Sequence, residues 1–137
     1  MTSRLSKITL ALMCTALVSG CEWRGLNSLE LPGTHGRGDG AYEVIIEMPD
    51  VTTLERNSRV RTGDVTIGRV ADLQLADGHA VVTVVIDEGT ELPANAIAKI
   101  GQTSLLGSAH VELGAPTTEA PRGRLEDGDV IPPGRAE

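Results

Sequence analysis

The chain has 137 residues, which suits one domain and is short for two. Hydrophobic residues make up 40% and charged residues 23%, as in a folded globular domain and unlike a disordered tail. There is one Trp, one Tyr and no Phe, which argues against the base-stacking platforms of nucleic-acid-binding modules. The formal charge of −7 also argues against binding to a nucleic-acid backbone.

Residues 1–20 have the pattern of a lipoprotein signal peptide. Arg4 and Lys7 precede an apolar stretch, residues 8–18, that is too short to span a bilayer. Small residues then lead to Cys21 in the sequence Leu-Val-Ser-Gly-Cys, which resembles a bacterial lipobox. We therefore expect cleavage after residue 20 and lipid attachment to the thiol of Cys21. An ordinary signal peptide followed by a chance cysteine is the alternative.

Cleavage there leaves an acidic chain that acyl groups must hold at the membrane. Residues 1–20 contain two basic and no acidic residues, so the remainder has a formal charge of −9 and is not attracted to anionic lipid. We expect a protein anchored through Cys21 to the outer face of the cell membrane. Residues 21–40 are expected to be a Gly-rich linker, in which Arg37-Gly38-Asp39 is interpreted as a turn.

Residues 41–133 predict a small all-β domain, and residues 134–137 a short tail. The first expected elements are a strand from Tyr42 that ends before Pro49 and a helical turn, capped by Asp50, that carries Val51 and Leu54. An extended segment, Arg59–Thr62, and further strand residues follow: Val65, Ile67, Val70, Leu73 and Leu75. The remaining expected strands are Ala80–Ile86, Ala96–Ile100, His110–Leu113 and Leu125–Ile131. The strongest prediction is Ala80–Ile86, which is almost entirely β-branched and follows the hairpin signal Asp77-Gly78. Such short, closely spaced strands indicate a sandwich or barrel.

No catalytic or metal site is predicted. His35, His79 and His110 are scattered, without the spacing of metal ligands, and are most simply solvent-facing. Ser104, Ser108 and His110 are close in sequence but lack the strained turn and partner carboxylate of a hydrolase triad. We expect a non-enzyme that needs no metal and no cofactor.

The segment Gly101–Ser108 is unusual because two adjacent leucines lie in an otherwise polar loop between strands. Adjacent residues cannot both point inward from one strand, so Leu105 or Leu106 is exposed or meets a partner. Two interpretations stay open at this point. The leucines plug one end of the barrel, or they form an apolar contact surface for a subunit or a lipid.

The motifs that follow one another from residue 41 to residue 132 resemble the MCE (MlaD-like) domain family. The resemblance begins with Val60-Arg61-Thr62-Gly63-Asp64-Val65-Thr66-Ile67-Gly68-Arg69-Val70 and Asp72-Leu73-Gln74-Leu75. It continues in the family's order with Ala80–Ile86, Leu92-Pro93, Ala96–Ile100, Ser104-Leu105-Leu106-Gly107, Val111-Glu112-Leu113 and Leu125–Pro132. With these motifs and the lipobox, the chain resembles the lipoprotein (E-type) subunit of an actinobacterial Mce system.

The resemblance implies a small seven-stranded MCE β-barrel, six of which form a ring around a hydrophobic lipid conduit powered by an ABC transporter. The implied partners are other MCE subunits in a heterohexamer, an ABC permease and ATPase, and a lipid or sterol substrate, with no nucleic acid. The family's pore loop matches Ser104, Leu105, Leu106 and Gly107. We therefore expect a membrane-anchored, non-catalytic subunit of a lipid import system. A surface lipoprotein that binds a host or cell-envelope partner is the alternative.

Overall fold

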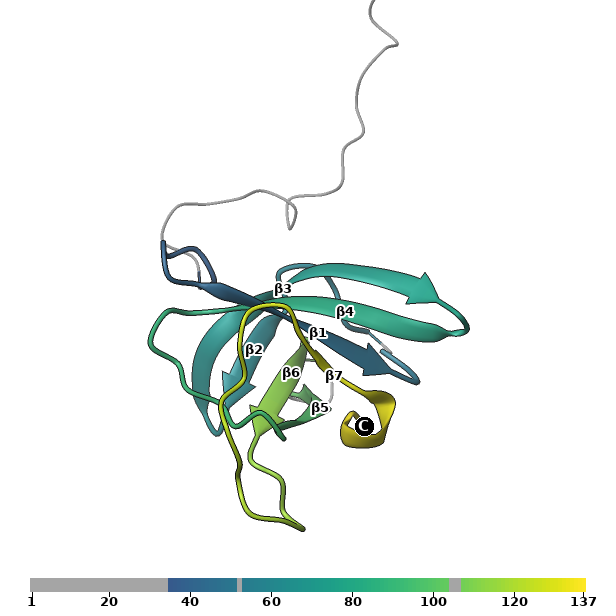
Figure 1. Ribbon diagram of the computed structural model, residues 1–137. Coiled ribbons are helices and arrows are strands. Elements are labelled where there is room, and N and C mark those ends of the chain that lie inside the picture. The colour runs from purple at the N-terminus through teal and green to yellow at the C-terminus, as the bar shows by residue number, and fades with distance from the viewer. Residues whose placement is uncertain (1–34, 52, 104–106) are drawn as a thin grey trace, which may run out of the picture.

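A computed structural model describes residues 35–51, 53–103 and 107–137, and these residues form one seven-stranded sheet that curls on itself (Figure 1). The strands are β1 (Tyr42–Met48), β2 (Arg59–Thr62), β3 (Val65–Ala76), β4 (His79–Ile86), β5 (Ile97–Gln102), β6 (Ala109–Gly114) and β7 (Asp129–Ile131), followed by the 3-10 turn η2 (Pro133–Arg135). The predicted all-β fold class is confirmed.

The strand order is β5-β6-β2-β3-β4-β1-β7, and the C-terminal residues join its two edges. After β7 and η2, the chain returns to β5, where Ala136 pairs with Ala98 in a parallel bridge. The amide of Glu137 donates to the carbonyl of Ala98 over 2.9 Å, and the amide of Ile100 donates to the carbonyl of Glu137 over 3.0 Å. Residues of the expected tail thus contribute to closing the sheet, and Ala136 is buried.

Aliphatic side chains fill the interior of the curled sheet. In β1 the inward residues alternate with Glu43, Ile45 and Glu47, as expected for a strand with one buried face. The largest fully buried side chains include Ile46, Met48, Ile86, Leu113, Leu125 and Ile131. Each such side chain contributes ~1.5–3 kcal/mol to folding when it leaves water. The fully buried core of the described residues is therefore non-aromatic, and Tyr42 packs against it from a partly buried position.

The long strand β3 brings three of its apolar residues to the core by means of two β-bulges, whereas Val65 and Leu75 near its ends are exposed. Ile67, Val70 and Leu73 are spaced three apart, whereas strict alternation would require a spacing of two. One register shift lies where β3 pairs with β2, and another lies between Val70 and Asp72, where it pairs with β4. Each extra residue changes the face on which the next side chains lie, so all three apolar residues contact the core.

Of two turns that the sequence predicts next to these strands, the structure confirms one and differs at the other. Asp77 and Gly78 have φ angles of 50° and 81°, which confirms the predicted hairpin between β3 and β4. In place of the expected helical turn before β2, an amide-to-carbonyl bond of 3.0 Å from Leu54 to Val51 closes a turn. Thr53 in that turn has a φ of 65°, which a right-handed helix does not allow.

The last strand is shorter than the predicted segment Leu125–Ile131. Leu125 is buried as expected, but the next residues form a turn. The amide of Glu126 donates to the Asp129 carboxylate over 2.8 Å, and the Asp129 amide donates to the Glu126 carbonyl over 3.1 Å. Gly128 adopts a φ of 83° there, so β7 begins only at Asp129.

Candidate functional site

The predicted lipid anchor and most of the predicted pore loop lie outside the described residues. This applies to Cys21 and to Ser104, Leu105 and Leu106. Gly107 is described, is partly exposed and lines a pocket beside the loop. The described part of the site is therefore the base of the loop and its surroundings.

The loop leaves the sheet at a fixed point, because bonds across its base extend the β5–β6 pairing. The last pair of the ladder is Gln102 with Ala109. Beyond it, the amide and the hydroxyl of Thr103 both donate to the carbonyl of Ser108, over 3.5 and 3.4 Å. Thr103 and Ser108 thus continue the antiparallel pairing of β5 with β6 beyond the last pair of the ladder.

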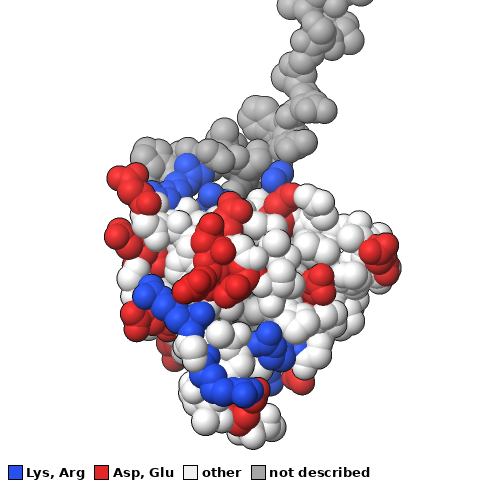
Figure 2. Space-filling view, in the orientation of Figure 1, with Lys and Arg blue, Asp and Glu red and all other residues white. Residues whose placement is uncertain are grey.

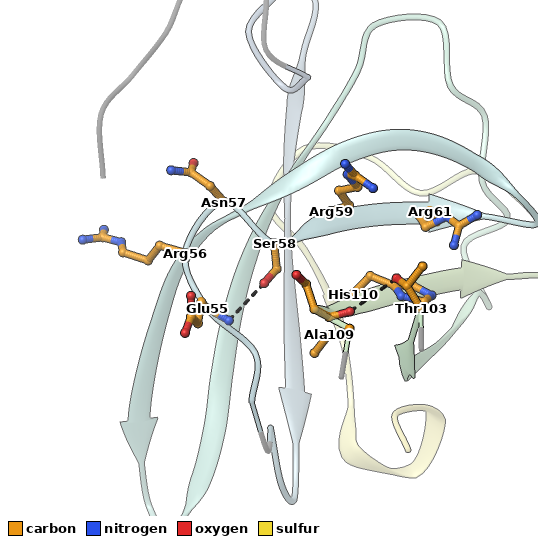
Figure 3. A pocket seen from close by; sticks show the side chains of 11 residues that line it. Glu55, Arg56, Asn57, Ser58, Arg59, Arg61, Thr103, Ala109 and His110 are labelled. Atoms are coloured by element: carbon orange, nitrogen blue, oxygen red, sulfur yellow. Dashed lines mark hydrogen bonds between the residues drawn. The ribbon is translucent and has the colours of Figure 1, made fainter. Parts of the chain in front are cut away.

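A pocket of about 430 Å³ lies beside the base of this hairpin (Figure 3). The parallel pairing of β2 with β6 creates it, because the starts of both strands lie at the same end of the sheet. The lining residues are Glu55, Arg56, Asn57, Ser58, Arg59, Arg61, Thr103, Gly107, Ser108, Ala109 and His110. A second cavity of about 240 Å³ shares several of these residues and also reaches Thr53.

The arginines of the pocket differ in how they are held. Arg56 contacts the carboxylate of Asp72 at 2.9 Å and points away from the other arginines. Arg61 contacts Asp64 at 3.0 Å, and its side chain is only 20% exposed, whereas Asp64 is fully exposed. Arg59 has no ion-pair or hydrogen-bond partner within the described ranges. The pocket therefore contains one cation without a bound carboxylate and another with a weak, solvent-exposed partner.

His110 belongs to this site, which the sequence did not indicate. Its side chain is 12% exposed rather than solvent-facing, because its ring lies over Gly101, its partner on β5. A Cβ at Gly101 would come within 2.5 Å of the ring. The Nε2 atom is 3.8 Å from a carboxylate oxygen of Glu112, and Nδ1 is buried without a hydrogen bond to any described residue. The pairing of Gly101 with His110 could have indicated that the histidine ring is covered, but this pairing is known only once the strand register is known.

The end of the expected linker is docked on the barrel at the end of β4. The imidazole of His35 contacts the carboxylate of Asp87, and the amide of Gly36 donates to the same carboxylate. Asp87 is itself fixed, because its amide donates to the carbonyl of Ile67 over 2.7 Å. A bond of 3.0 Å from the amide of Ala41 to the carbonyl of Gly38 agrees with the predicted turn.

The single tyrosine lies at the start of β1, in a partly buried position. Burial raises the pKa of Tyr42, nearby Arg124 lowers it and Glu91 raises it. The phenol donates to the carbonyl of Thr90 over 3.0 Å. Tyr42 lines neither of the cavities described above, so its titration is a property of the fold rather than of the pocket.

Two kinds of feature are absent from the described ranges. They contain no group of three or more His, Cys, Asp or Glu that could hold a metal ion. No helix within them is long and apolar enough to cross a membrane.

The comparisons with known proteins agree with the fold and with the order of its motifs. Residues 40–116, more than half of the chain, match the protein family described as MlaD protein. The chain belongs to the MlaD (MCE) family. The matched residues include β1 to β6 and the whole β5–β6 loop. The resemblance inferred from the sequence is thereby confirmed.

Two relatives of this MlaD domain are informative. It is 55% identical over 122 residues to the protein named lipoprotein LprN of Mycobacterium tuberculosis. That alignment covers 85% of this chain and 32% of LprN, so the chain spans about a third of the length of its relative. The fold is similar to a chain of the Acinetobacter MlaFEDB complex in an ATP-bound conformation, with a TM-score of 0.62 at 19% identity. That similarity covers 99% of this chain and 92% of the other and supports the fold.

Proposed function

We propose that the chain is a membrane-anchored, non-catalytic subunit of an Mce-type ABC system that imports lipid or sterol. Its MlaD domain takes one place in a hexameric ring of different MCE chains, and an ABC permease and ATPase are the further partners. The observation that carries the proposal is the MlaD match over residues 40–116, which includes the loop with Leu105 and Leu106. The name of the lipoprotein relative and the ATP-bound state of the similar complex support it.

The packed core supports a conduit that runs between domains and not through one of them. Ile46, Leu113 and Ile131 are fully buried inside the curled sheet. Their side chains fill the interior, so it contains no space for a lipid. A lipid path through this domain would require the core to be emptied. Several domains arranged around a common axis can instead enclose a path with their loops.

Adjacent leucines in such a loop suit the transfer of an acyl chain. Passage through water costs ~0.8 kcal/mol per methylene, and therefore more than ~10 kcal/mol for a long acyl chain. Leu105 and Leu106 supply apolar surface that removes part of this cost. The chain acts by excluding water along the path and needs no catalytic residue.

The anchor and the docked linker set how far the domain can lie from the membrane. Thirteen residues lie between Cys21 and His35, where the chain contacts the barrel. Even fully extended, this segment spans no more than ~50 Å. Lipidation of Cys21 with more than one acyl chain gives stable membrane attachment, which the acidic domain cannot provide itself.

The proposal is tested by isolating the full-length chain from its own membranes with a mild detergent. Native mass spectrometry then identifies the proteins and lipids that remain bound. We expect other MCE chains, an ABC ATPase and a bound lipid. Saturable binding to a host or envelope protein, with neither MCE chains nor lipid present, would contradict the proposal and favour the adhesion alternative.

A further inference from the structure

The pocket beside the β5–β6 loop has a charge opposite to that of the chain. Its lining contains three arginines and one glutamate, although the formal charge of the whole chain is −7. Acidic side chains gather at the centre of the face shown in Figure 2. In the segment next to β1, the Asp127 carboxylate accepts the amide of Glu43, and the Asp129 carboxylate accepts the amide of Glu126. None of these acidic residues lines the pocket, whose only carboxylate among the described residues is that of Glu55.

Arg59 and Arg61 bring the positive charge to this site. Val60 between them is fully buried, so both arginines lie on the outer face of β2. Arg59 has no partner among the described residues, and Arg61 has only the fully exposed Asp64. An exposed ion pair contributes little, so an incoming anion can compete for the guanidinium of Arg61. Guanidinium groups bind phosphate oxygens in pairs with matched geometry.

Further hydrogen-bond donors complete the same pocket. Arg59, Arg61 and His110 gather on one side of it, together with Thr103 (Figure 3). The Oγ atom of Ser58 accepts the amide of Glu55 over 3.0 Å, so its own hydroxyl proton can be donated to a ligand. The pocket thus offers two guanidinium groups with an imidazole and a hydroxyl nearby.

The size and polarity of the pocket restrict its ligand. A volume of about 430 Å³ is that of a small-molecule site, larger than a bare phosphate ion needs. The charged and polar lining does not suit an acyl chain. We propose that the pocket binds the phosphate of a phosphate ester, such as the phosphodiester headgroup of an anionic phospholipid, with Arg59 and Arg61 on its oxygens. The phospholipid as its source rests on the proposed function, whereas phosphate binding itself does not.

The test uses the full chain in a non-ionic detergent, at near-physiological salt, and measures equilibrium binding by calorimetry. The probes are dihexanoyl phosphatidylglycerol, inorganic phosphate, and dihexanoylglycerol as the uncharged lipid. We expect saturable binding of phosphatidylglycerol, competition by inorganic phosphate, and no binding of dihexanoylglycerol. Inorganic phosphate that binds as tightly as the lipid supports the site and assigns it to free phosphate.

The variants separate this site from general charge attraction. Arg59→Gln with Arg61→Gln should weaken phosphatidylglycerol binding roughly tenfold or more. Arg122→Gln with Arg124→Gln removes the same charge from exposed side chains outside the pocket and should leave binding unchanged. Arg59→Gln alone removes an exposed side chain with no described partner, so it keeps the fold while lowering the affinity.

Three results would overturn the inference: equal binding by the parent chain and the Arg59/Arg61 variant, equal binding of dihexanoylglycerol, or equal weakening in the Arg122/Arg124 control. Lipid uptake is measured separately on the same variants. If the parent chain binds phosphate as expected but supports no lipid uptake, the proposed function is contradicted while the phosphate site is still supported.

Discussion

Replacing Gly68 with alanine should strongly destabilise the domain, because β3 and β4 approach too closely there for any side chain. Gly68 is buried and pairs with Ile86 on β4. A Cβ at this position would lie 2.1 Å from the carbonyl oxygen of Val85 and 3.1 Å from the Cα of Ile86. Both obstructing atoms are backbone, so no side-chain rotation can relieve the clash.

The expected size of the effect follows from this geometry. A carbon and a carbonyl oxygen in contact are ~3.3 Å apart, so the strands must separate locally by about 1 Å. Overpacking of this kind costs ~1–3 kcal/mol, and each backbone hydrogen bond that is lost adds about 1 kcal/mol. We expect Gly68→Ala to lower the free energy of unfolding by about 3 kcal/mol. For a domain of this size, that corresponds to a fall in Tm of roughly 12–24 °C.

Thermal unfolding followed by circular dichroism measures this difference, and Gly114→Ala provides the control. Gly114 also lies in a strand, but no atom lies within 4 Å of an added Cβ and its φ is not left-handed. Gly114→Ala should therefore leave Tm nearly unchanged or raise it slightly, by restricting the unfolded chain. If the two variants melted within a few degrees of each other, the close approach of β3 and β4 would be refuted.

Three further predictions concern the anchor, the tyrosine and the docked linker. Cys21→Ala should abolish metabolic labelling with a fatty acid, and label retained on the variant would reject the anchor. Because burial raises the pKa of Tyr42, its phenolate absorbance should appear at higher pH in the folded than in the unfolded chain. The contribution of Tyr42 to the free energy of unfolding should then be constant below about pH 10 and fall above it. A phenolate that appears at the same pH in the folded and the unfolded chain would contradict the effect of burial. Asp87→Ala should speed hydrogen exchange at the amide of Gly36 while the strand amides stay protected, and unchanged exchange would show that Asp87 does not hold the linker.

The sequence predicts the strands and the simple hairpins well, because these depend on neighbouring residues. The β-branched run of β4 and the Asp77-Gly78 turn are local patterns, and both are confirmed. The two bulges of β3 are different. They depend on which residues of other strands lie opposite, and alternation along one strand does not contain that information. The turn before β7 is local, because bonds between Glu126 and Asp129 close it, and the apolar pattern of Leu125–Ile131 does not reveal it.

The candidate site could be predicted only in part for the same reason. The loop with Leu105 and Leu106 is recognisable because it breaks a local rule. The pocket forms from β2 and β6, which lie far apart in the sequence and pair in parallel. Neither the gathering of Arg59 with His110 nor the cover that His110 gives to Gly101 follows from spacing along the chain.

The most direct test of the central claim is lipid uptake measured on the double variant Leu105→Asn with Leu106→Asn, alongside its melting temperature. Polar groups in a conduit hold water and raise the cost of passing an acyl chain, so we expect uptake to stop while Tm stays unchanged. If the leucines instead plug the barrel, replacing them should cost as much as other core truncations, ~2–5 kcal/mol each, and Tm should fall steeply. Uptake at the parental rate would contradict the claim that this loop lines the path of the lipid.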